Sequence, residues 1–245
     1  CHRSTVVADC LWQNIRHHDL IMTEGEFMAS FLEVFYFDTD ELMHIACAVL
    51  ALTLAFTLLD QVPANLFMLM FFLNLVTVGL GVVLHELAHK FVAIRYGAFA
   101  RFIAWPAGLA LMIIMAAMHF PLLIAAPGAV YIFTPLGKKE YGIVSVAGPL
   151  TNIALSLLFA AAMFPVAALT SSLPGISTYL MLLLASGAQI NAWLAVFNML
   201  PIPPLDGSKV LPWDGKVYAG VIVFALLLVF IIVPLLAESA QLLSG

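Results

Sequence analysis

Long apolar stretches separated by short polar breaks run through most of the chain. Five stretches, at about 42–59, 66–90, 142–164, 177–200 and 217–236, are long enough to cross about 30 Å of hydrocarbon as helices rising about 1.5 Å per residue. Proline, glycine and serine occupy the breaks, as at 171–175. The pattern predicts an all-α polytopic membrane protein with five to six transmembrane helices.

A sixth apolar stretch, at about 103–132, contains helix-breaking residues at Pro106, Pro121 and Pro127. Two crossings need about 40 residues and this stretch has about 30, so it predicts one crossing or a re-entrant hairpin. The run after Pro127, from Gly128 to Ile132, is rich in strand-favouring residues and predicts a short β-segment.

The polar positions gather at the start of the chain. Residues 1–42 hold eight of the 14 acidic residues. We therefore divide the chain into an N-terminal extension at 1–41 and a single transmembrane domain at 42–240. Within the extension, residues 27–37 are apolar and aromatic, which fits a short interfacial helix or a poorly ordered tail equally well.

The composition excludes several classes of protein. The chain is 64% hydrophobic and 9% charged, with a mean hydropathy of +1.09, whereas soluble domains are about 45–50% apolar and about 25% charged. A net charge of −5 with nine Lys and Arg provides no basic surface for nucleic acid. Three scattered cysteines are too few for a disulfide framework or a cysteine zinc site.

The second apolar stretch ends in His85-Glu86-Leu87-Ala88-His89, an H-E-x-x-H motif. Helix positions i and i+4 share one face, so His85 and His89 can bind one Zn²⁺. Glu86 points away from that face and can take a proton from a water on the metal as a general base. Ionisable residues are costly inside a membrane helix, which favours a functional site over a helix end at the interface.

A catalytic zinc needs a third protein ligand. Asp206 is the candidate, because it follows a long apolar stretch in a segment with three prolines and is followed by Gly207. A broken helix at membrane depth is tolerated where it is buried or lines a cavity. The alternative is an ordinary Asp-Gly turn at the interface.

The motifs together resemble the site-2 protease family of intramembrane zinc metalloproteases (peptidase family M50). The resemblance rests on the H-E-x-x-H motif, on Gly148-Pro149-Leu150-Thr151-Asn152, and on Asn198-x-x-Pro-x-Pro-x-x-Asp-Gly ending at Gly207, and covers about 66–210. It implies one zinc per chain held by His85, His89 and Asp206, with Glu86 as base and cleavage within the bilayer. It also implies that Asn152, and similarly Asn198, contact the substrate or the oxyanion, although Asn152 fits a helix-packing amide as well.

The topology follows from the shared metal. The stretches 66–90 and 177–200 carry their ligands at their C-terminal ends, so they must run parallel with an odd number of crossings between them. The stretch 142–164 supplies one crossing, so 103–132 contributes an even number, which favours a re-entrant hairpin. All nine Lys and Arg then fall on one side, which predicts a cytoplasmic N-terminus and active-site mouth.

The sequence thus predicts an intramembrane zinc endopeptidase in a lipid bilayer, which by resemblance is a prokaryotic cell membrane. By the same resemblance its substrates are single-span membrane proteins, and no nucleic acid is involved. The strand at 129–132 is expected to form an edge to which an extended substrate adds. The alternatives are a metal transporter, a non-catalytic metal-binding scaffold, or an H-E-x-x-H peptidase acting on prenylated C-termini. The oligomeric state is left open.

Overall fold

The computed structural model describes residues 38–119, 128–170 and 174–244. Its elements are α3 (Thr39–Leu59), α4 (Phe67–Arg95), β1 (Ala100–Ala104), α5 (Pro106–Ala117), β2 (Gly128–Ile132), α6 (Lys138–Thr170), α7 (Pro174–Asn198), α8 (Gly207–Trp213), α9 (Gly215–Leu227), a π-helical turn (Leu228–Ile232) and α10 (Val233–Ser244). The interfacial helix expected at 27–37 lies outside the described residues.

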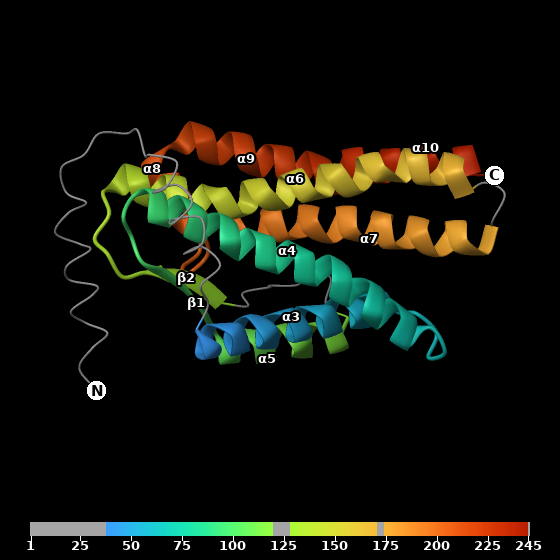
Figure 1. Ribbon diagram of the computed structural model, residues 1–245, viewed down its shortest axis with the longest axis horizontal. Helices are drawn as coiled ribbons and strands as arrows, with labels where there is room; N and C mark the ends of the chain where they lie inside the picture. The colour runs from blue at the N-terminus through green and yellow to red at the C-terminus, as the bar shows by residue number, and fades with distance from the viewer. Residues whose placement is uncertain (1–37, 120–127, 171–173, 245) are drawn as a thin grey trace, which may run out of the picture.

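The described residues include five helices long and apolar enough to cross a membrane: α3, α4, α6, α7 and the continuous run Gly215–Ala240 through α9 and α10. They lie side by side along the long axis of the molecule (Figure 1). The prediction of an all-α polytopic membrane protein is confirmed. The sequence pattern placed these helices well because each is a long apolar run between polar breaks.

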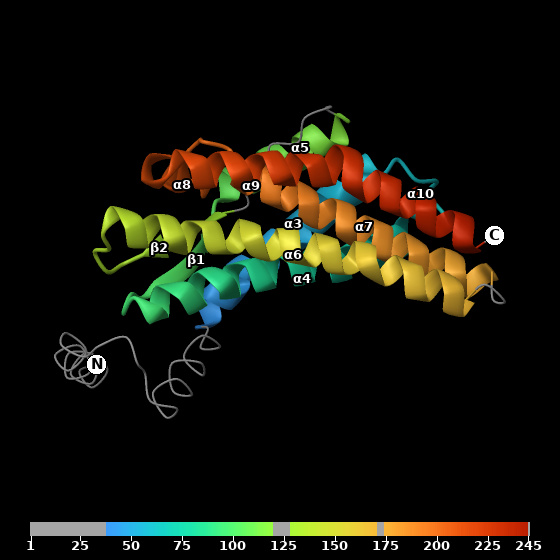
Figure 2. The same ribbon diagram turned by 90° about the horizontal axis from the view of Figure 1, so that it is seen from above.

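The chain direction alternates along the bundle, so α4 and α7 run the same way and α3, α6 and α9 run the opposite way (Figures 1 and 2). The C-terminal ends of α4 and α7 therefore lie at one end of the molecule, together with α8. This is the parallel arrangement that a metal site shared by the two apolar stretches requires.

Small side chains bring α6 and α7 together. Ala160 and Ala167 of α6 and Ala188, Ala192 and Ala195 of α7 are fully buried in one cluster that also contains residues of α9 and α10. In a membrane, helices associate through such close van der Waals packing rather than through a hydrophobic driving force. The contact fixes the position of α6 beside α7.

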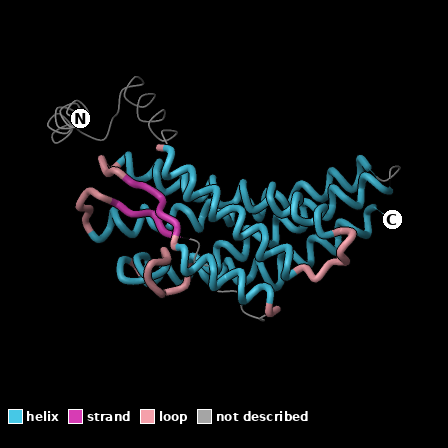
Figure 3. Tube along the Cα trace, turned by 90° about the horizontal axis from the view of Figure 1, so that it is seen from below, coloured by secondary structure: helices cyan, strands magenta, loops and turns pink. Residues whose placement is uncertain are grey.

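The segment between α4 and α6 leaves and returns at the same end of the bundle. β1 pairs antiparallel with β2, with Ala100 opposite Ile132 and Ala104 opposite Gly128. Figure 3 shows the two strands at that end, while the short apolar helix α5 packs against α3 (Figure 1). The expectation of a β-containing segment near 103–132 is confirmed, and the predicted strand at 128–132 is β2. Residues 120–127 lie outside the described residues, so the re-entrant hairpin stays a prediction.

β1 was not predicted. Its first three residues, Ala100, Arg101 and Phe102, precede the apolar stretch, and its last two were assigned to that stretch. The side chains of Ala100, Phe102 and Ala104 are buried and those between them are partly exposed. This alternation is the signature of a strand with one covered face, but five residues are too few to distinguish it from the end of a helix by pattern alone.

Candidate metal centre

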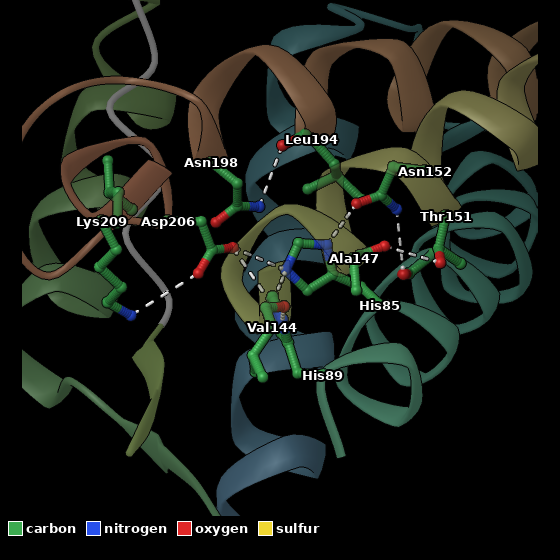
Figure 4. Close-up of polar contacts among 12 residues, drawn as sticks. His85, His89, Val144, Ala147, Thr151, Asn152, Leu194, Asn198, Asp206 and Lys209 are labelled. Carbon is green, nitrogen blue, oxygen red and sulfur yellow. Dashed lines mark hydrogen bonds and ion pairs between the residues drawn. The ribbon is translucent and has the colours of Figure 1, made fainter. Parts of the chain in front are cut away.

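Three buried side chains converge at the end of the bundle that holds α8. His85 and His89 lie one turn apart on α4, with their Nε2 atoms 3.0 Å apart. Asp206 Oδ2 lies 3.3 Å from His85 Nε2 and 3.1 Å from His89 Nε2 (Figure 4). The three ligand atoms lie within 4.8 Å of one another, so one metal ion could contact all of them.

Asp206 reaches the histidines because the chain folds back after α7. Asp206 occupies the N-cap position of α8, but its side chain makes no capping hydrogen bond and is directed at α4 instead. Gly207 permits this turn, because a Cβ there would lie 2.6 Å from the carbonyl oxygen of Leu200. The backbone of 199–206 can therefore pack closely against the start of α8.

Gly148 of α6 makes room for the two imidazole rings. A Cβ at this position would lie 2.5 Å from His85 Cε1 and from His89 Nε2. The next residue, Pro149, has no N–H and so removes one helical hydrogen bond at the same turn. The Gly-Pro pair thus lets α6 approach the face of α4 that carries the histidines.

Hydrogen bonds at the other ring nitrogen fix the tautomer of each histidine. His89 Nδ1 lies 2.8 Å from the carbonyl oxygen of Val144, which can only accept, so Nδ1 carries the proton. His85 Nδ1 lies 2.6 Å from Asn152 Oδ1, also an acceptor. In its neutral form each ring would then present an Nε2 lone pair to the same space, where one metal ion could contact both nitrogens and Asp206.

The orientation of Asn152 is in turn fixed by two further contacts. Its Nδ2 donates to the carbonyl oxygen of Gly81 at 3.1 Å and to Asn191 Oδ1 at 3.0 Å. Asn152 and Asn191 are fully buried, and together they join α4, α6 and α7. The structure therefore places Asn152 behind His85, on the side away from Asp206 (Figure 4).

Asn198, the second candidate for contact with substrate, lies at the end of α7. Its Nδ2 donates to the carbonyl oxygen of Leu194 at 3.0 Å. Figure 4 shows its side chain beside Asp206. Asn152 and Asn198 therefore lie on different sides of the histidine pair.

Glu86, the residue between the two histidines in the motif, is 7% exposed. Among the described residues its Oε2 has no hydrogen-bond partner. A buried carboxylate oxygen without a partner is costly, and a water on an adjacent metal would satisfy it. This observation fits the role expected of a base.

Lys209 lies beside the other oxygen of the Asp206 carboxylate, with Nζ 3.6 Å from Oδ1. Burial by itself would raise the pKa of Asp206, whereas the positive charge of Lys209 beside Oδ1 lowers it and favours the ionised carboxylate. Asp206 is therefore ionised, with Oδ2 directed at the histidines and Oδ1 at Lys209.

Sequence reasoning did not identify Asn191 or Lys209 as part of the site. Asn191 had a signal, because an amide in the middle of an apolar span usually has a polar partner. Lys209 was counted only among the charges on one side of the membrane. Its link to Asp206 follows from the turn of α8, which places position i+3 next to position i.

The chain is similar to one curated protein of Methanocaldococcus jannaschii, named "Putative zinc metalloprotease MJ0611". The two are 39% identical over 189 residues, which is 77% of this chain and 92% of the relative. No protein-family model matches the chain, and no solved structure matches it. The matched length is large enough to include most of the bundle.

Proposed function

Because the chain belongs to the zinc metalloprotease family of this archaeal relative, we propose that it is an intramembrane zinc endopeptidase of the site-2 protease type. Its ligands would be His85, His89 and Asp206, and its base Glu86. The observation that carries the proposal is the convergence of one ligand atom each from His85, His89 and Asp206 within 4.8 Å, buried in a helix bundle of membrane-spanning dimensions.

The residues around the site suit peptide hydrolysis. When bound, zinc would lower the pKa of a water molecule and polarise the peptide carbonyl. Glu86 would accept the proton of the attacking water and pass it to the leaving amine. Asn152 and the Val144 carbonyl would hold the two imidazoles in the tautomer that binds metal.

The proposed substrates are single-span membrane proteins that enter the site in an extended form. A helical segment shields its own amides, so it must unwind before water can attack. An extended segment can add to β2, because within the described residues the sheet has only the two strands β1 and β2. We place the mouth of the site on the cytoplasmic side of a prokaryotic cell membrane, where the positive-inside rule puts Lys90, Arg95, Lys138 and Lys209.

A metal transporter is the second candidate, since intramembrane ionisable residues also mark ion pathways. The described residues contain one group of three or more metal-ligating side chains, His85, His89 and Asp206. A pathway requires successive sites, whereas these side chains converge on one. The unpartnered carboxylate of Glu86 next to that site also favours hydrolysis.

The test combines zinc content with cleavage of a single-span substrate in proteoliposomes. We expect about one zinc per chain in the wild type and in Glu86→Gln, and much less in Asp206→Ala. Cleavage should be lost in both variants. Full activity of Glu86→Gln, or unchanged zinc in Asp206→Ala, would contradict the assigned roles, and zinc flux across the liposome without cleavage would identify a transporter.

A further inference from the structure

A buried ion pair joins the first turn of α3 to the metal-binding helix. Glu41 is 3% exposed and Lys90, the residue after His89, is 5% exposed. Lys90 Nζ donates to Glu41 Oε2 at 2.7 Å. By sequence the two residues resemble an ordinary helix-start acid and an ordinary interfacial lysine, and only the fold brings them together from 49 positions apart.

The second oxygen of the same carboxylate contacts the sheet. Glu41 Oε1 accepts the backbone N–H of Phe102, in the middle of β1, at 3.0 Å. One buried side chain therefore contacts both the helix that carries the histidines and the strand that pairs with β2. Figure 1 shows the N-terminal end of α3, in blue, beside the sheet.

This contact determines which edge of the sheet is open. Because the Phe102 N–H points at α3, it points away from β2, so Phe102 and Val130 form a non-hydrogen-bonded pair of the antiparallel ladder. Phe99 and Phe133, three positions away on each strand, are joined by a hydrogen bond from Phe133 N to Phe99 O. Hydrogen-bonded and non-hydrogen-bonded pairs alternate along an antiparallel ladder, so this bond agrees with a non-hydrogen-bonded pair at Phe102 and Val130. Val130 then turns its N–H and C=O away from β1. Within the described residues no third strand pairs with this side of β2, which we call the open edge, whereas α3 contacts β1.

Burying two charges costs several kcal/mol per ion, and a well-packed apolar pair of similar volume is often as stable or more stable. Stability alone therefore does not explain a buried ion pair in a chain with 9% charged residues. We propose that Glu41 is a positioning residue. It holds β1, and through it the open edge of β2, at a fixed place relative to His85 and His89, and this role rests on the proposed addition of substrate to β2.

Two double variants separate the strand contact from the ion pair. Glu41→Gln with Lys90→Met removes both charges but keeps an acceptor for Phe102 N–H. Glu41→Leu with Lys90→Met removes the acceptor as well. The control is Asp40→Asn in the same turn, because Asp40 is 71% exposed and lies 3.5 Å from Arg101, and it should behave as wild type.

The readouts are amide exchange of the β1 segment, zinc content, and KM and kcat for a single-span substrate. For the Leu/Met double variant we expect exchange at Phe102 about tenfold faster and KM about tenfold higher, with zinc and kcat unchanged. The Gln/Met double variant should stay close to wild type in amide exchange, zinc content, KM and kcat.

Equal exchange rates in the two double variants would overturn the proposal, as would faster exchange without a change in KM. Loss of zinc in the Leu/Met variant would also overturn it, because the pair would then hold α4 itself. If the wild type cleaves no substrate, the proposed function fails, and exchange and zinc content still decide whether Glu41 holds the strand in place.

Discussion

Asn152 Oδ1 accepts a hydrogen bond from His85 Nδ1 at 2.6 Å, and this contact joins the middle of α6 to the face of α4 that carries the two histidines. Hydrogen bonds of this kind orient a metal-binding imidazole and fix its tautomer, and their loss typically reduces metal affinity by about 10–100-fold. Asn152 can therefore be tested by metal binding independently of catalysis.

We expect Asn152→Ala to bind zinc about 10–100-fold more weakly than the wild type, as measured by competition with a chelator. Asn198→Ala is the matched control, because Asn198 bonds only its own helix at Leu194 among the contacts described, and its zinc affinity should not change. Wild-type zinc affinity in Asn152→Ala, with loss of cleavage, would instead favour a role on the substrate or oxyanion.

We expect Gly148→Ala to lose zinc, because the added methyl group would occupy the space beside both imidazoles. The matched control is Gly220→Ala in α9, where a Cβ meets nothing within 4 Å. That change should leave zinc binding intact and stabilise the helix by about 0.5–1 kcal/mol. Equal zinc content in the two variants would contradict the prediction, because it would mean that α6 can move away from α4 without loss of zinc binding.

Val130→Pro tests the open edge of β2. The Val130 N–H points away from β1, so proline removes a donor from the open edge and leaves the ladder with β1 intact. We expect normal zinc content and a KM several-fold higher for a single-span substrate. Tyr131→Pro, which removes a donor to β1, should disturb the strand pair itself, and unchanged KM in Val130→Pro would exclude strand addition at this edge.

Asp60, at the other end of the bundle, gives a pH-dependent prediction. Burial raises its pKa above the ordinary 3.8, while a hydrogen bond from Asn74 partly offsets the rise. The folded protein then binds this proton more tightly than the unfolded chain, so its contribution to stability falls as pH rises through the raised pKa. Asp60→Asn keeps an acceptor for Asn74, and its melting temperature should not fall as pH rises through this range. The same pH dependence of the melting temperature in the wild type and in Asp60→Asn would contradict the prediction.

The parts of the fold and site that could be predicted are those that leave a pattern within one segment of the sequence. The helices follow from continuous apolar runs, and His85 and His89 follow from a spacing that one helix turn defines. Asp206 required the histidine pair, its place in a proline-rich break after a long apolar stretch, and a family resemblance, because nothing local separates a ligand from an Asp-Gly turn. The structure brings it beside the histidines.

The unpredicted parts depend on contacts between distant segments. The Glu41–Lys90 pair and the Asn152–Asn191 contact join residues 49 and 39 positions apart. Each partner alone has an ordinary explanation, as a helix start, an interfacial charge or a packing amide. Only the arrangement of α3, α4, α6 and α7 distinguishes these explanations.

The order of the ligands along the chain has a consequence for biosynthesis. His85 and His89 lie on α4, whereas Asp206 follows α7. A growing polypeptide that has been inserted only as far as α6 has the imidazoles but lacks the carboxylate that completes the trio. The proposed centre would therefore form only after α7 has entered the bilayer, and a chain inserted only as far as α6 would lack its third ligand.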